Sequence, residues 1–208
     1  GDPWNLVLGF AVLFLARLLG NLYFINNIRH EELNSRFRRQ LIVDVVPFLV
    51  FFLAFVIRTL LKDGFAVNPD SGLIVMEPFK YFHNLIEMPY LLVLFLIGVV
   101  GVLYGIGKSI FCKTYTRGIW FAGIGTVLTV LALLLVVGYN HTAYYPSTAD
   151  LQSSLTIANS CSSQFTLKTM AYVSILVPFV LAYIIYAWRA IDRKPLTMKE
   201  VKEDDHSY

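Results

Sequence analysis

The sequence predicts an all-α integral membrane protein with five transmembrane helices, arranged as a four-helix bundle plus a final helix. Of its 208 residues, 57% are hydrophobic and only 15% are charged, whereas soluble domains carry about 25% charged residues. The apolar residues form five long runs, and runs of roughly 20 residues match the hydrocarbon thickness of a bilayer. The runs are apolar on every side, unlike the alternating strands of membrane barrels.

The five predicted helices follow one another in a single membrane domain, residues 1–208. Their approximate bounds are 6–25, 41–61, 90–106, 119–137 and 170–188. The long connections 62–89 and 138–169 are expected on one side of the membrane, and the tail 189–208 on the other. The segment 64–89 is partly apolar but contains Asp70, Glu77 and Lys80, which leaves two interpretations open: an ordered loop or interfacial helix, or a plain solvated loop.

Positive residues in the connections indicate the orientation, because lysine and arginine are retained on the cytoplasmic side. Twelve of them lie in the connections 26–40 and 107–118 and in the tail: Arg29, Arg36, Arg38, Arg39, Lys108, Lys113, Arg117, Arg189, Arg193, Lys194, Lys199 and Lys202. The opposite side has three, namely Lys62, Lys80 and Lys168. We therefore expect the first residue outside and the C-terminus in the cytoplasm.

The chain begins with Gly1-Asp2-Pro3-Trp4 and enters the predicted membrane at once. This start has no initiator methionine, no basic stretch and no cleavage-site pattern. We therefore expect the chain to be the later part of a longer protein, as a fragment or a cleaved chain. A processed N-terminus is the alternative.

The two cysteines and the common motifs indicate no chemistry. Cys112 and Cys161 are expected on opposite sides of the membrane, so they cannot form a disulfide within one chain. The sequence also lacks the spacings typical of zinc hydrolases, phosphate-binding loops and dinucleotide-binding turns. We expect no nucleic-acid partner.

Arg17 and Asp44 are the candidate functional charges, because an ionised residue in hydrocarbon costs about 2.5–3.5 kcal/mol on insertion scales. Arg17 lies near the middle of the run 6–25, and Asp44 lies three residues into the run 41–61. In antiparallel helices they would differ in depth by about 7 Å, which a long arginine side chain can span. The pair is either a structural clamp or part of a proton path or of a lipid or quinone headgroup contact.

Histidine positions bear on whether this chain holds haem, since membrane haem proteins usually need imidazole at helix depth. All four histidines lie in the connections or in the tail: His30, His83, His141 and His206. Met88 and Met170 lie near helix ends, where methionine is typical of ordinary packing. The residues therefore predict no catalytic residue, no metal site and no haem on this chain.

Three glycines predict a close contact between helices. Gly98, Gly101 and Gly105 lie three and four residues apart within the run 90–106, which puts them on one helix face. Small residues at this spacing let a neighbouring transmembrane helix approach closely.

The region 145–188 carries the most specific pattern. In order it contains Tyr145-Pro146-Ser147, Ser154-Leu155-Thr156, Asn159 followed by Ser162-Ser163, and Thr166-Leu167 followed by Met170. This pattern closely resembles the C-terminal region of subunit II of the cytochrome bd family of quinol oxidases, and His206-Ser207-Tyr208 is similar to that family's tail. Ser160-Cys161 departs from the small residues usual in the family.

The resemblance implies a fold and a function. The family has nine transmembrane helices, two four-helix bundles plus a last helix, so the four runs between 6 and 137 would be the second bundle. The implied protein is the non-haem structural subunit of an oxidase of the bacterial inner membrane, which passes electrons from quinol to oxygen. Haems b and d would lie in subunit I, the main partner. The family's acidic proton-path residues lie in the half that is missing here.

The resemblance also implies further ligands and partners. Membrane lipid and a small accessory subunit are candidates, and some members hold a quinone within subunit II. An aromatic run on the second predicted helix could accommodate a quinone, although such residues are more typical of core or lipid contact: Phe48, Phe51, Phe52 and Phe55.

Two other classes of membrane protein share some of these features. A fragment of a secondary transporter is the alternative function, since Arg17, Gly101 and Pro178 interrupt otherwise apolar runs and transporters use broken helices. A channel would need polar pore-lining positions, which the runs do not offer.

The orientation leads to a first testable prediction. A reporter fused after Tyr208 should indicate the cytoplasm, and a reporter inserted near Asp150 should indicate the outer side, because the positive residues are concentrated in the opposite connections. Paired alkaline phosphatase and fluorescent protein fusions at both sites measure this. Reversed signals at the two sites would contradict the orientation.

Overall fold

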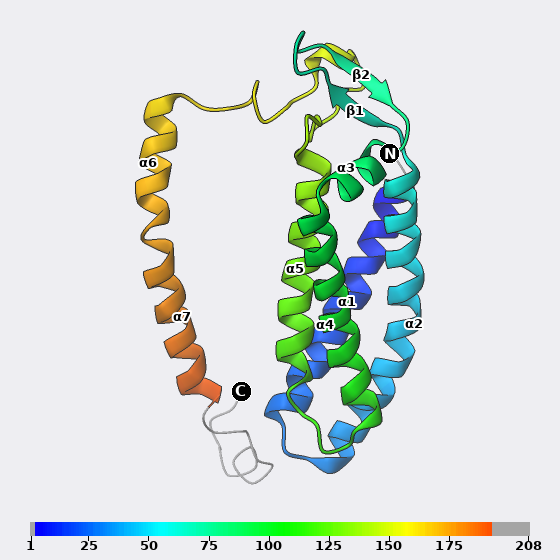
Figure 1. Cartoon of the computed structure of the whole chain (residues 1–208). Coiled ribbons are helices and arrows are strands. Elements are labelled where there is room, and N and C mark those ends of the chain that lie inside the picture. Colours follow the sequence, from blue (N-terminus) through cyan, green and yellow to red (C-terminus); the bar gives the residue numbers. More distant parts are fainter. Residues whose placement is uncertain (1–2, 193–208) are drawn as a thin grey trace.

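A computed structural model describes residues 3–192 and shows five helices long and apolar enough to cross a membrane. Four form an antiparallel bundle: α1 (Pro3–Asn27), α2 (Glu31–Leu61), α4 (Pro89–Phe111) and α5 (Gly118–Gly138) (Figure 1). The fifth consists of α6 (Gln164–Ser174) and α7 (Val177–Asp192), which stand apart from the bundle (Figure 1). The tail from residue 193 on, including His206, lies outside the described residues. The prediction of a helical bundle plus a final helix is confirmed.

The helices of the bundle extend beyond the predicted apolar runs, most of all α2, which begins ten residues before Leu41. Its first turns contain charged residues, so they do not belong to an apolar run, yet they form a stable beginning of the helix. The His30 side chain accepts a hydrogen bond from the Leu33 backbone N–H at 3.3 Å, and Glu32 pairs with Arg36 at 2.6 Å. Caps and pairs at this spacing stabilise helix ends.

The segment 62–89 is ordered and contains an element that the sequence did not predict. Strands β1 (Gly64–Val67) and β2 (Ile74–Glu77) form an antiparallel hairpin, followed by the short helix α3 (Lys80–Glu87). The Asn68 side chain accepts hydrogen bonds from the backbone of the turn, which is closed by Gly72 at a φ of 67°. The interpretation as a plain solvated loop is therefore wrong. We call this end of the bundle the hairpin end, and the opposite end, with the α1/α2 and α4/α5 connections, the basic end.

The final span is longer than predicted and is interrupted. It begins at Gln164 rather than near residue 170, because the Ser163 hydroxyl caps the helix by accepting from the Thr166 N–H at 3.3 Å. The helix breaks between Ser174 and Val177, just before Pro178, whose ring and missing N–H disfavour a continuous helix. A ring contact between Tyr23 and Trp188, with centroids 6.2 Å apart, links this span to α1.

The predicted close approach of helices at the glycines of α4 is confirmed. Gly98 and Gly105 are buried against α5. A Cβ atom added to Gly98 would lie 2.6 Å from the Thr129 backbone nitrogen, and one added to Gly105 would lie 2.6 Å from the Gly118 carbonyl oxygen. These distances are too short for any side chain, so α4 and α5 pack backbone against backbone.

Substituting one of these glycines tests the contact. Gly98→Ala should lower the free energy of unfolding by about 1–3 kcal/mol, because the methyl group pushes α5 away from α4. Gly107→Ala on the same helix is the matched control, since nothing lies within 4 Å of its added Cβ. Thermal unfolding of the detergent-solubilised full-length protein measures both. Equal stabilities of the two variants would contradict this packing.

Candidate functional site

The structure brings the two predicted membrane charges together. Asp44 on α2 is 1% exposed, and the Arg17 Nη2 atom on α1 lies 3.0 Å from its Oδ1 atom. Two amides complete the cluster. Gln40 donates from Nε2 to Oδ1 at 3.0 Å, and Asn21 donates from Nδ2 to Oδ2 at 3.3 Å.

Helix periodicity explains why these four residues meet. Gln40 and Asp44 lie four residues apart on α2, and Arg17 and Asn21 lie four residues apart on α1, so each pair shares one helix face. Sequence reasoning considered only the charged members and missed Gln40 and Asn21. The available signal was the identical spacing of a polar residue beside each charge.

The contacts satisfy both oxygen atoms of Asp44. Both of its oxygen atoms accept a hydrogen bond or an ion pair from the protein, which compensates the cost of removing a charge from water. Arg17 differs, because its side chain is 50% exposed and its guanidinium lies 5.9 Å from the centre of the Phe14 ring. The cluster therefore has a buried anionic side and an open cationic side.

Arg38 joins α2 to the end of α4 at the basic end. Its guanidinium donates hydrogen bonds to four backbone carbonyl oxygens, those of Ser109, Cys112, Lys113 and Tyr115. Free carbonyls at a helix C-terminus carry partial negative charge and need such donors. Sequence reasoning counted Arg38 only as a loop charge, and no spacing within the sequence indicated its distant partners.

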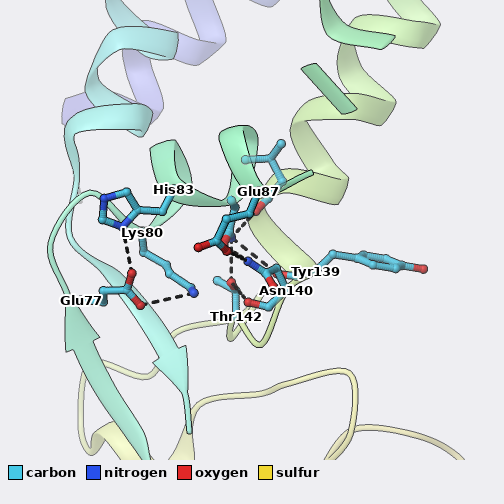
Figure 2. A network of polar contacts seen from close by, with 9 residues as sticks. Glu77, Lys80, His83, Glu87, Tyr139, Asn140 and Thr142 are labelled. Carbon is cyan, nitrogen blue, oxygen red and sulfur yellow. Dashed lines mark hydrogen bonds and ion pairs between the residues drawn. The ribbon is translucent and has the colours of Figure 1, made fainter. Parts of the chain in front are cut away.

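A buried amide joins α3 to the end of α5 at the hairpin end (Figure 2). Asn84 is fully buried and donates to the Val136 carbonyl at 2.9 Å and to the Thr142 hydroxyl at 2.8 Å. Its oxygen accepts from Asn140 at 3.0 Å, and Asn140 also donates to the Glu87 carboxylate. The network closes the bundle beneath the hairpin.

Figure 2 also shows Glu77 at the end of β2 between Lys80 and His83 of α3. Its carboxylate lies 3.3 Å from the Lys80 Nζ and 3.0 Å from the His83 Nδ1. The hydrogen bond from His83, with the nearby Lys80 charge, holds the pKa of the Glu77 carboxyl below its ordinary value. The group ties the hairpin to α3.

The residues that carry the family pattern form a self-bonded loop. The Thr156 backbone N–H donates to the Asn159 side chain at 2.7 Å, and the Asn159 N–H donates back to the Thr156 hydroxyl at 3.1 Å. Asn159 also donates to the Ser154 carbonyl, and the buried Ser154 hydroxyl accepts from the Ser147 N–H at 3.0 Å. Polar residues are required at these positions to fold the loop, whatever its chemistry.

This loop is also bonded to the hairpin. The Gln152 side chain accepts from the Ile74 N–H at 3.0 Å and donates to the Ile74 carbonyl at 2.8 Å, so its amide takes the place of a neighbouring strand. On the other edge, the segment 141–143 pairs with β1 through hydrogen bonds to Val67 and Phe65. The connection to the final span is therefore anchored at the hairpin end.

The described histidines lie outside the five candidate spans. His30 caps α2, and His141 follows α5. His83 lies in the connection 62–89, as expected, and there it belongs to the short helix α3. Within residues 3–192, no group of three or more histidine, cysteine or acidic residues is placed to hold a metal ion.

The phenylalanines considered for quinone binding divide into two groups. Phe48, Phe52 and Phe55 line an apolar cavity of about 100 Å³ between the four bundle helices. Phe51 instead stacks on Phe10 of α1 at 5.2 Å. The hydroxyls of the two threonines in the cavity wall are bonded to their own helix: Thr126 and Thr129 donate to backbone carbonyls of α5.

These features define a multi-pass helical membrane protein. The model of the family "Cytochrome bd terminal oxidase subunit II" matches residues 1–191, and the chain belongs to this family. It is 24% identical over 220 residues to cytochrome bd-I ubiquinol oxidase subunit 2 of Escherichia coli K12, with the same values for the O157:H7 protein. The alignment covers 99% of this chain and 56% of each relative, so the chain spans about half their length. The family excludes the secondary-transporter alternative.

A double-mutant cycle tests whether Arg17 and Asp44 stabilise the contact of α1 with α2. Arg17→Ala and Asp44→Ala should each reduce assembly of the full-length complex, and the double variant should lose less than the sum. The expected coupling is about 1 kcal/mol or somewhat more, measured from thermal unfolding in detergent. Arg58→Ala with Asp44→Ala is the matched control and should be additive, since the Arg58 guanidinium lies over Trp4 instead. Strict additivity for Arg17 and Asp44 would rule out the clamp.

Proposed function

We propose that this chain is part of the non-haem subunit of a bd-type terminal oxidase, a complex of the bacterial inner membrane that oxidises quinol, reduces oxygen to water and contributes to the proton gradient. The family match over residues 1–191 carries this proposal. The printed name of the Escherichia coli relatives, a ubiquinol oxidase subunit, supports the substrate class. The basic end would face the cytoplasm, since it carries most of the positive residues.

The role of the chain would be structural. Three of its described polar side chains hold helices together: Asp44 between α1 and α2, Arg38 between α2 and α4, and Asn84 between α3 and α5. The described histidines lie outside the spans, where they cannot reach the centre of a bilayer. Haems b and d would then be bound by subunit I, and this subunit would support the fold of its partner.

We propose no quinone site in the cavity between the bundle helices. Sites for small molecules usually measure about 300–1,000 Å³ and place polar groups against the ligand, whereas this cavity has about 100 Å³. Its threonine hydroxyls already donate to the backbone of α5. Phe48, Phe52 and Phe55 therefore serve the packing of the bundle, and no step of the reaction is assigned to them.

The absorption spectrum tests the proposed division of roles. The full-length subunit purified alone should show no haem bands, and the complex with subunit I should show b-type and d-type bands. Substituting His30, His83, His141 and His206 one at a time should leave these bands unchanged, because none of the described histidines lies within a span.

The control is the amount of both subunits in each purified variant. If one substitution abolishes a haem band while both subunits still co-purify in normal amounts, that histidine is a ligand and the structural role is wrong. A native complex without any haem band would contradict the oxidase function itself.

A further inference from the structure

Arg17 has unused binding capacity on the outside of the bundle. A guanidinium carries five N–H donors, and among residues 3–192 its partners are the Asp44 carboxylate and the face of the Phe14 ring. Half of the side chain is exposed. Asp44, in contrast, has both oxygens occupied and 1% exposure. The cluster can therefore accept an additional anionic group at Arg17, and it offers no site for a cation.

The cluster lies near the basic end of the membrane-spanning region. Asp44 is three residues after Leu41, where the apolar part of α2 begins, a distance of about 5 Å along the helix. Asn21, which also bonds Asp44, lies six residues before the end of α1, or about 9 Å. The Arg17 backbone is deeper, ten residues before the end of α1 or about 15 Å. Its side chain extends towards the basic end to reach Asp44, so its guanidinium lies closer to the headgroup region than its backbone does.

One face of α1 continues from Arg17 into the hydrocarbon as an exposed apolar stripe. Leu13, Phe10 and Leu6 lie four, seven and eleven residues before Arg17, which places all of them on the same helix face. They are 52%, 47% and 67% exposed. The surface is thus cationic at the membrane boundary and apolar below it, the same order of polarity as in an anionic phospholipid.

We propose that Arg17 binds the phosphate of an anionic phospholipid whose acyl chains lie along Leu13 and Phe10. Asp44, which is buried and bonded by the half-buried amides of Gln40 and Asn21, fixes the guanidinium at the surface. Planar guanidinium groups bind phosphate oxygens in pairs, and the exposed basic residues Arg29 and Arg39 at the same end raise the local concentration of anionic headgroups.

Native mass spectrometry of the delipidated full-length complex, titrated with phosphatidylglycerol or phosphatidylcholine, tests this site. The wild type should bind a first phosphatidylglycerol more tightly than phosphatidylcholine, and Arg17→Gln should reduce this preference about fivefold. Arg58→Gln is the matched control, because Arg58 is also a span arginine but lies near the hairpin end of α2 over the Trp4 ring. It should keep the wild-type preference.

The double variant Arg17→Gln/Asp44→Asn removes the guanidinium without leaving a buried carboxylate unpaired, so it tests the site even if the single variant is unstable. It should lose the preference to the same extent. An unchanged preference in either variant, or an equal loss in Arg58→Gln, would overturn the proposal. An Arg17 variant that no longer co-purifies with subunit I but keeps its preference for phosphatidylglycerol would also overturn the proposal, because Arg17 would then contact protein. Haem bands recorded on the same samples report separately on the proposed oxidase function.

Discussion

A carboxylate that is 1% exposed inside an apolar helix pair must have its hydrogen-bond acceptors satisfied by the protein, because hydrocarbon supplies no donors. Asp44 meets this requirement with donors from both helices, Arg17 and Asn21 from α1 and Gln40 from α2. The requirement fixes more than one contact. It sets how far α1 is shifted along α2 and how it is rotated. A displacement by one residue would replace Arg17 and Asn21 with Leu18 and Leu22, or with Ala16 and Gly20, none of which has a side-chain donor.

The same rule governs both ends of the bundle. At the basic end, Arg38 supplies donors to the free carbonyls after α4. At the hairpin end, Asn84 donates to the Val136 carbonyl near the end of α5 and accepts a hydrogen bond from Asn140. Between these ends, α4 and α5 need few polar groups, because the glycine contacts allow direct backbone packing. Polar side chains therefore determine where the helices end, and small residues determine how closely they pack.

The apolar runs predicted the number and position of the spanning helices, because insertion into hydrocarbon depends on local hydropathy alone. The ends of α2 and of the final span were missed, since capping by His30 and Ser163 continues a helix beyond its apolar part. The hairpin was also missed: strands of four residues are too short to show alternation. The ion pair between Arg17 and Asp44 could be predicted from the depth of the two residues in the membrane. The partners of Arg38 are more than 70 residues away in the sequence, so they could be identified only from the fold.

The pattern that indicated the family belongs to a loop and to the first turns of α6. Ser154, Thr156 and Asn159 bond one another, and Gln152 attaches the same loop to β2. The described side chains of α6 and α7 are almost all exposed, and Tyr23 and Trp188 provide the ring contact between this span and the bundle. The loop thus fixes where the final span enters the membrane while leaving its apolar faces available.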